Sequence, residues 1–484
     1  QSSTMLADPL MQAILPQGFD IDRQSYLPST VFINGKYWGI HNVRERLNSH
    51  YIESNYGIED DDVDILGVKY WYFYIIEGDM DEYDQLINIL HQDTISDPTV
   101  YNYIKTKVDI DELLNYVIIQ MYIANFDWPK NNMKLWREKS NAGKWRWIVN
   151  DVDAGFRKHS TINDYTSDGE TNNIFQWIET INTVINNNEM IGGLTIFSEL
   201  LEYQVFRDEF IQRSAYYLNS IFELNRITGI IDSLSANINQ EISRHILRWE
   251  NICNEDSLYC SLINSLEHWE NNILFMKQFA AERPDTLRQN IIDYFALSGI
   301  SELKIDISDT NAGIIMVHDQ NIQSYPDTGI YFRDIPIRIA AIPNVGYQFL
   351  NWEGISSDIS DSSSIFLTIS GDSAVTAVFE PTLSLIDKIL IPNQYALYQN
   401  YPNPFNPFTT LSYDLPEEVM VTITINDIMG RNVRSLINSH QDAGHYSIRW
   451  DATNNDGKSV SAGMYFYVIK ADNFVQARKM VLLK

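Results

Sequence analysis

The stretch that decides the fold is NFDWPKNNMKLWREKSNAGKWRWIVNDVDAGF, residues 125–156. MKLWRE and WRWIVN read as two strands, and SNAGK between them has the composition of a tight turn. A hairpin brings its two ends together. Asp127 and Asn132, which precede the first strand, are therefore expected near Asp151, which follows the second, although 24 residues separate Asp127 from Asp151.

This arrangement suits phosphoryl transfer, where positioning and charge neutralisation do most of the work. Asp127 would orient or accept the proton of an attacking hydroxyl. Asn132 and Asp151 would hold Mg²⁺, which prefers hard oxygen ligands and takes few of them from protein. Protein kinases use the same order of Asp, four residues, Asn, strand, turn, strand and Asp. The alternative is that these side chains satisfy turn backbones, as loop Asp and Asn usually do.

Other candidate residues are weaker individually. Arg44, Glu45 and Arg46 end a predicted strand, where an arginine could contact phosphate and Glu45 could pair with a catalytic lysine. Surface ion pairing is the alternative, and it contributes little. Lys130 lies in the loop of Asp127 and could touch the transferred phosphoryl group, or be a solvated loop lysine.

The composition excludes several classes of protein. Of the 484 residues, 35 are basic and 64 acidic, a net charge of −29. A nucleic-acid binder needs a basic face, and docking on anionic lipid needs one too. No apolar run approaches the roughly 18–20 residues of a membrane span. Cys253 and Cys260 could form a short extracellular disulfide or remain thiols, and their spacing does not indicate zinc.

Patterning divides the chain into three regions. Residues 1–298 begin with a hairpin around Asn34-Gly35, continue with a helix over 110–124 capped by Asp109, and become almost wholly helical after 194. Residues 160–190 read as a loop. Residues 301–382 and 391–484 consist of short strands separated by turn residues, which predicts two small all-β domains.

The first region resembles the CotH kinase-like family, named for a bacterial spore coat protein. The similar segments are residues 31–52, 125–138, 144–156, 206–222, 241–249 and 279–291. The resemblance implies an atypical protein kinase that uses ATP and Mg²⁺ or Mn²⁺ to phosphorylate protein Ser or Thr. It makes Asp127 the catalytic aspartate, Asn132 and Asp151 metal ligands, and Asp153 a supporting acid.

In that family the domain begins well before a position like Gln1, so its first strands and a phosphate-contacting lysine are expected to be missing here. The implied fold is an α+β atypical protein-kinase-like domain, N-terminally incomplete, with a helical C-terminal half. Leu-Ala-Asp at 6–8 stands where the family often has Leu-Arg-Asp.

The two β regions carry resemblances of their own. AAIPNVGYQFLNWEG within 301–382 is similar to an InlB B-repeat, with Tyr347, Phe349 and Trp352 as its small core. Residues 391–484 resemble the FlgD-like Ig module that serves as a C-terminal sorting domain of type IX secretion, an Ig-like sandwich. That implies a secreted or outer-surface protein which engages the secretion machinery.

Three functions stay open from the sequence. The first is an exported kinase with a protein substrate. The second is a non-catalytic surface or scaffold protein with a degenerate kinase-like domain, since ATP is scarce outside cells. The third is another nucleotide-using transferase, one that attaches AMP or an amino acid.

Overall fold

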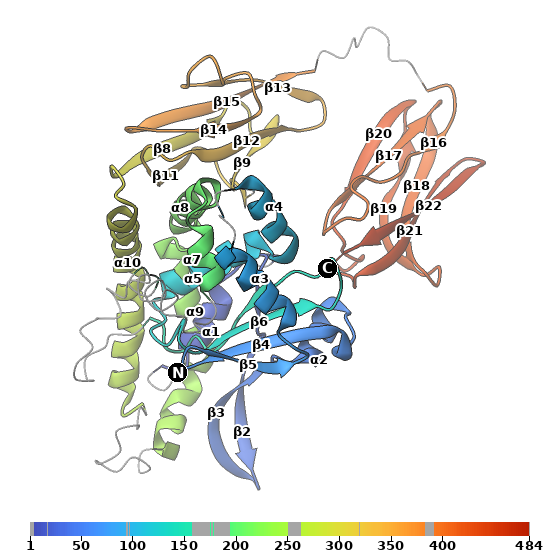
Figure 1. Cartoon of the computed structure of the whole chain (residues 1–484). Coiled ribbons are helices and arrows are strands. Elements are labelled where there is room, and N and C mark those ends of the chain that lie inside the picture. Colours follow the sequence, from blue (N-terminus) through green and yellow to red (C-terminus); the bar gives the residue numbers. More distant parts are fainter. Residues whose placement is uncertain are drawn as a thin grey trace. The chain divides into compact units, whose positions relative to one another are not determined.

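A computed structural model describes residues 4–156 (except 17, 93, 94 and 96), 175, 178, 194–249, 263–382 (except 319) and 392–483. Cys253, Cys260 and most of the loop predicted over 160–190 lie outside these residues. The chain divides into two compact units, Gln1–Pro381 and Thr382–Lys484. The first unit holds an α/β region and the first set of β-sheets, and the second is all-β (Figure 1).

A five-stranded sheet lies in the α/β region. Its strand order is β1-β7-β6-β4-β5, with bounds β1 Asp22–Arg23, β7 Arg146–Val149, β6 Met133–Glu138, β4 Val63–Lys69 and β5 Tyr72–Glu77. β6 and β7 are antiparallel, with Lys134 opposite Ile148. The hairpin predicted from the 125–156 stretch is therefore confirmed, and it stands in the middle of the sheet.

The two faces of this sheet pack against different helices. Leu135 and Trp147 belong to the main core, which continues into the helices. Trp136 and Ile148 point to the other face and form a small cluster with Ile52 of helix α2 (Ser49–Tyr56). Alternate residues of a strand point to opposite faces, so each strand serves both cores.

Helices fill the rest of the α/β region. They are α1 Ala7–Ile14, α3 Asp81–Gln92, α4 Pro98–Lys107, α5 Ile110–Ile123, α7 Thr195–Leu200, α8 Gln204–Asn219, α9 Leu224–Trp249 and α10 Leu266–Phe295, with a short 3-10 helix η1 at Asp60–Asp62. The helical character predicted after residue 194 is confirmed for the described residues.

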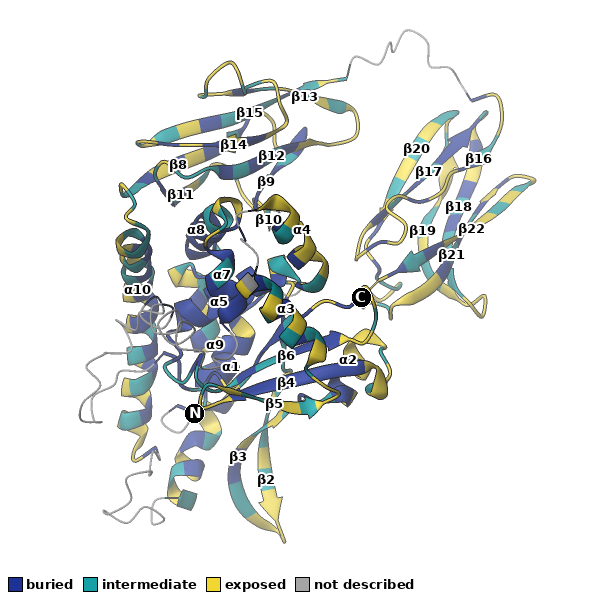
Figure 2. Cartoon of the chain, in the orientation of Figure 1, coloured by how far each residue is buried: buried dark blue, intermediate teal, exposed yellow. Residues whose placement is uncertain are grey.

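Helix α5 is the central helix. Asp109 caps it as predicted, because its carboxylate accepts a hydrogen bond from the backbone N–H of Glu112 at 3.4 Å. The sequence indicated one apolar stripe, but the helix is buried on every side (Figure 2). Its C-terminus, and the loop that follows, are therefore held in a fixed position.

A two-stranded hairpin, β2 (Tyr26–Ile33) with β3 (Lys36–Arg44), carries Arg44 at its end. The predicted Asn34-Gly35 turn is confirmed, with φ of 50° and 73°. Helix α9 holds the hairpin: His245 Nδ1 accepts from Ile40 N at 3.0 Å. Gly39 has φ of 109°, and a Cβ there would lie 2.7 Å from the Trp249 ring. Close packing thus sets where Arg44 lies.

Residues 300–381 form two four-stranded sheets, with orders β10-β9-β12-β14 and β11-β8-β15-β13. Their bounds are β8 Ile300–Ile307, β9 Gly313–Val317, β10 Gln320–Asn321, β11 Asp327–Phe332, β12 Ile337–Pro343, β13 Tyr347–Glu353, β14 Ser364–Leu367 and β15 Ser373–Pro381. Trp352 is buried, while Tyr347 and Phe349 are partly buried around the same core. We call these sheets the second module.

Helix α8 covers an edge of the second module. β11 is the last strand of its sheet, and two amide side chains seven residues apart on α8 take the place of a neighbouring strand. Gln212 bonds both the N–H (3.3 Å) and the C=O (2.8 Å) of Phe332. Asn219 bonds the N–H (3.1 Å) and the C=O (3.0 Å) of Ile330. The outward backbone groups of Ile330 and Phe332 are thereby satisfied.

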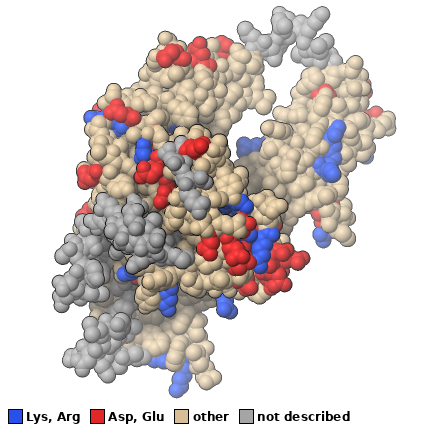
Figure 3. All heavy atoms as spheres, in the orientation of Figure 1, with Lys and Arg blue, Asp and Glu red and all other residues tan. Residues whose placement is uncertain are grey.

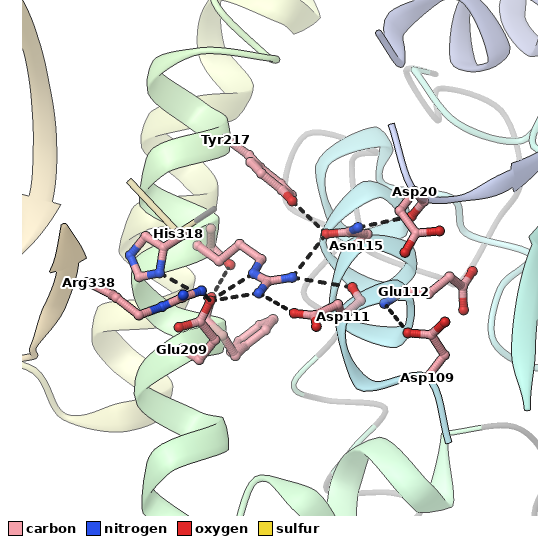
Figure 4. A network of polar contacts seen from close by, with 12 residues as sticks. Asp20, Asp109, Asp111, Glu112, Asn115, Glu209, Tyr217, His318 and Arg338 are labelled. Carbon is pink, nitrogen blue, oxygen red and sulfur yellow. Dashed lines mark hydrogen bonds and ion pairs between the residues drawn. The ribbon is translucent and has the colours of Figure 1, made fainter. Parts of the chain in front are cut away.

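A network of charged side chains beside this contact also links α8 to the second module (Figure 4). Glu209 of α8 accepts hydrogen bonds from Arg213 at 2.7 Å and from His318 Nδ1 at 3.1 Å, and Arg338 lies 3.8 Å away. Burial raises the pKa of Glu209, but the bonds from His318 and Arg213 outweigh it and hold that pKa well below its usual range. Arg213 also donates a hydrogen bond to Asp111 of α5, so the network reaches that helix.

The second unit is a sandwich of two sheets, β16-β17-β20 and β19-β18-β21-β22. Their bounds are β16 Ala396–Leu397, β17 Thr409–Leu415, β18 Val419–Asp427, β19 Asn432–Gln441, β20 Gly444–Trp450, β21 Gly463–Ala471 and β22 Phe474–Leu482. Inward residues such as Ile423, Trp450 and Tyr467 form its own core. Among the described helices of the whole chain, none has the length and apolar character to cross a bilayer.

We predict that Gln212→Leu loosens the second module. Gln212 is fully buried (0% exposed), and its loss leaves buried backbone groups of Phe332 and Ile335 without partners. The cost is about 3 kcal/mol, so amides of β11 and β12 should exchange about a hundredfold faster in native-state hydrogen exchange. Gln204→Leu, on the exposed side of the same helix, is the control. Equal exchange in both variants would contradict the role of this contact.

Candidate active site

The loop of Asp127 is tied to two elements. Asn125, buried, donates to Gln120 Oε1 of α5 at 3.1 Å and accepts from the Asp127 N–H at 3.4 Å. Asn131 donates to Asp127 Oδ1 at 3.4 Å and accepts from the backbone N–H of Tyr70, in the β4–β5 turn, at 2.8 Å. Asp127 therefore has a fixed backbone and a carboxylate with a local donor.

Asn132 links this loop to the end of β7. Its amide nitrogen donates to the backbone carbonyl of Asp151 at 3.3 Å. Both residues adopt left-handed backbone angles, with φ of 59° for Asn132 and 46° for Asp151, a conformation that Asn and Asp tolerate better than most residues. The structure thus places the two predicted metal ligands next to each other, at the two ends of the hairpin.

Asp8 of α1 supports the loop of Asp151. It is 1% exposed, accepts a hydrogen bond from the backbone N–H of Val152 at 3.2 Å, and forms an ion pair with Arg44. On the other side, the N–H of Phe156 donates to the C=O of Ile123 at 2.9 Å. Sequence analysis noted Asp8 only as part of a family motif and missed this positioning role.

Like charges gather at Asp151. Partial loss of water raises its pKa, and the negative charges of Asp153 and Asp127 raise it further, against the opposing effect of Arg44. The three carboxylates are therefore electrostatic neighbours, as the predicted hairpin requires. Burial lowers the pKa of Arg44, and Asp153 and Asp151 favour its charged form.

Lys134 is a second residue that sequence reasoning missed. It lies on β6, two residues after Asn132, which precedes the strand. Its ammonium donates to the carbonyl of Leu47 at 3.4 Å, which brings it beside Arg46. Burial lowers its pKa; Asp151 opposes that shift and Arg46 adds to it. The available signal was its position in the sequence, two residues after the predicted metal ligand Asn132.

The remaining candidates lie around this group. Glu45 Oε2 accepts from the backbone N–H of Ser25 at 2.7 Å, so the described contact of its carboxylate is to backbone. Lys130 accepts from the N–H of Trp71 through its carbonyl at 2.9 Å, and its side chain is half-buried. Arg46 is exposed. The roles assigned to these residues stay predictions.

The donor set suits a metal ion that arrives with its substrate. Among the described residues, no three Asp, Glu, His or Cys side chains are grouped closely enough to hold an ion by themselves. Mg²⁺ usually takes one or two carboxylates from protein and completes its shell with phosphates and water. Asp151 lies beside Asn132 and is repelled by the neighbouring carboxylates of Asp127 and Asp153, a repulsion that a cation would relieve. This arrangement fits a metal ion bound together with phosphates better than an all-protein cage.

The site thus lies in an α/β region, where the loops that carry Asp127 and Asp151 meet at one end of the central hairpin. The family described as CotH kinase protein matches residues 3–287, so the chain belongs to this family. The family described as divergent InlB B-repeat domain matches 325–383, and FlgD Ig-like domain matches 408–473. These agree with the resemblances found in the sequence.

Comparison with curated proteins gave no match. Among solved structures, the chain is similar to dimeric latent PorU from Porphyromonas gingivalis (14% identity, TM-score 0.17, 38% of this chain and 18% of that one). It is also similar to the DNA glycosylase AlkC from Pseudomonas fluorescens (12%, 0.15, 21% and 33%) and to PorZ, a type-IX secretion component of P. gingivalis (11%, 0.15, 35% and 23%). The chain spans a third or less of each, and at these scores we draw nothing from them.

We predict that Asp151→Asn stabilises the protein without metal. A raised pKa means that folding favours the protonated carboxyl, so ionised Asp151 costs stability at neutral pH. Asn also tolerates the left-handed backbone. The variant should melt at a higher temperature at neutral pH, and the difference should vanish as pH falls below about 3, where the carboxyl is protonated in both the folded and the unfolded state.

The control is Asp293→Asn, an exposed carboxyl of α10. Millimolar Mg²⁺ should raise the melting temperature of the wild-type protein more than that of Asp151→Asn. Melting temperatures for Asp151→Asn that match the wild type at every pH would show that the carboxylates do not repel one another.

Proposed function

We propose that this protein transfers the γ-phosphoryl group of ATP to Ser or Thr hydroxyls of a protein, with Mg²⁺ or Mn²⁺. The observation that carries the proposal is the contact between Asn132 and the Asp151 backbone, with Asp127 close enough to perturb the Asp151 carboxylate. Membership of the CotH kinase family supports the same reaction.

In this mechanism Asp127 orients the acceptor hydroxyl and takes its proton. The hydroxyl oxygen forms a bond to the γ-phosphorus as the bond from that phosphorus to the β,γ-bridging oxygen breaks, and ADP leaves with the electron pair. Asn132 and Asp151 would hold the metal, with Asp153 supporting them. The metal, when bound, neutralises charge on the phosphates.

Cationic side chains beside the carboxylates complete the proposed site. Lys134 and Arg46 would bind phosphate oxygens. Lys130 would contact the transferred group from the loop of Asp127. Arg44, paired with Asp8, holds the Asp151 loop in place and is a positioning residue.

A non-catalytic scaffold with a degenerate kinase-like domain is the second candidate. A site that binds metal only with nucleotide and a degenerate site would both lack a preformed metal cage among the described residues, so this property does not distinguish them. Transfer of AMP or an amino acid would use the same carboxylates, and the label that reaches the acceptor distinguishes it from phosphorylation.

We also propose that the protein acts outside the cell, secreted or on the outer surface. Ig-like and B-repeat domains are of extracellular type, and both families match this chain. The C-terminal unit would then be the part that the type IX secretion machinery engages. Expression of that unit fused to a periplasmic reporter tests this, since export of the reporter is the expected result.

We predict that the full chain, with Mg²⁺ and ATP labelled at the γ-phosphate, labels itself or a Ser-rich protein. Asp127→Asn should lower kcat about a hundredfold or more because the base is lost. Lys134→Met should raise the KM for ATP about tenfold because a charged phosphate contact is lost. Asp151→Asn should abolish labelling.

Lys304→Met, an exposed lysine of β8, is the matched control and should keep full activity. Label carried by the α-phosphate instead would indicate AMP transfer. Persistent labelling in Asp151→Asn would refute the metal-binding role.

A further inference from the structure

Strand β5 is an open edge of the central sheet. It is last in the strand order and pairs with β4 on one side, and within the described residues no strand pairs with its other side. Unpaired edges attract extended chains, and proteins usually cover them. In this protein Gln212 and Asn219 cover the edge strand β11. An open strand edge such as β5 is therefore not general among its sheets.

The open edge begins beside the loop of Asp127. The turn between β4 and β5 is fixed to that loop by two backbone donors: Tyr70 N–H to Asn131 Oδ1 at 2.8 Å and Trp71 N–H to the Lys130 carbonyl at 2.9 Å. A chain lying along β5 would therefore pass Tyr72 next to the residues that flank Asp127.

The β4–β5 hairpin exposes several large apolar side chains. Tyr70 and Tyr72 are 67% and 68% exposed, and Tyr74 and Ile75, on opposite faces of β5, are 46% and 50% exposed. The end of the Tyr74 ring lies over Gly67, where a Cβ would come within 2.4 Å of it. Aromatic side chains of this kind contribute strongly to protein interfaces.

The far end of β5 is acidic. Glu77 and Asp79 are exposed, and Ile65, opposite Glu77, follows the three aspartates of η1 (Asp60–Asp62) by a few residues. Lys139 is the basic residue of this group, and it already bonds the Asp61 carbonyl at 3.0 Å. Figure 3 shows acidic side chains gathered in this part of the face.

We propose that β5 is the docking strand for the protein substrate, which adds an extended segment to the open edge. The segment places its Ser or Thr beside the β4–β5 turn, next to Asp127, an apolar residue against the exposed tyrosines, and Lys or Arg against Glu77 and Asp79. β5 spans about 17 Å from Tyr72 to Glu77 at 3.3 Å per residue. The basic residue thus lies about five residues from the hydroxyl. This inference rests on the proposed phosphotransferase function.

Synthetic peptides test the docking directly. The probe is a fluorescein-labelled extended peptide with a Ser, an adjacent Leu and Lys residues about five positions away, compared with the same peptide carrying Glu for Lys. A third peptide carries N-methyl groups on alternate residues, which block strand pairing. The full chain should bind and phosphorylate the Lys peptide with about tenfold better affinity and kcat/KM than either other peptide.

Two surface variants locate the contact. Glu77→Lys should remove or reverse the preference between the Lys and Glu peptides, and Tyr72→Thr should raise KM while leaving kcat and self-labelling unchanged. Glu353→Lys, an exposed glutamate of β13, is the control for charge. Far-ultraviolet circular dichroism and melting temperature show that the variants are folded.

The outcomes separate the two proposals. Peptide binding that depends on Lys, Glu77 and unmethylated backbone, without phosphoryl transfer, would support docking and refute the kinase function. Self-labelling with equal treatment of all three peptides would support the kinase and overturn docking at β5. A dimer in solution that Glu77→Lys or Tyr72→Thr dissociates would show that a second copy occupies the edge, which also overturns it.

Discussion

The antiparallel pairing of β6 with β7 is the constraint on which the site depends. Lys134 opposite Ile148 fixes the register, and the register places Asn132 beside Asp151. A slip of one residue would turn Lys134 to the other face of the sheet and send the buried Leu135 to the α2 side. The hydrophobic cores on both faces oppose such a slip, because Trp147 belongs to one core and Ile148 to the other. Packing therefore secures a geometry that like charges alone would disperse.

Buried supports allow carboxylates that repel one another to stay close. The loop of Asp127 and the loop of Asp151 both attach to α5, the first through Asn125 and Gln120 and the second through Phe156 and Ile123. Gly155 is needed for the second attachment, since a Cβ there would come within 2.8 Å of the Ile123 carbonyl. Asp8 adds a third support from α1. The buried part of α5 thus holds the two loops in place against the repulsion between their carboxylates.

The sequence predicted what local patterns determine. Strand alternation, turn residues and the Asp109 cap were sufficient for the central hairpin, the Asn34-Gly35 hairpin and α5. Contacts between residues far apart in the sequence could not be predicted in this way. Asp8 and Val152 are 144 residues apart, and nothing near Asp8 indicates that it meets a backbone N–H there. Gln212 and Asn219 look like ordinary polar helix residues until β11 lies against them, 120 and 111 residues later. Lys134 could have been found from the sequence, because it lies in the predicted strand MKLWRE only two residues after Asn132.

The amide side chains of α8 also affect how this architecture can be inherited. Repeat-type β modules are commonly independent folding units that recombination adds or removes. Here a break near residue 299 would uncover β11 and leave the helix with two amide side chains, the buried Gln212 and the partly buried Asn219, that lack these partners. The released module would tend to self-associate through its bare strand. The α/β region and the module that follows it are therefore expected to travel through gene rearrangements as a single cassette, whereas the C-terminal sandwich, with a core of its own, is free to be exchanged.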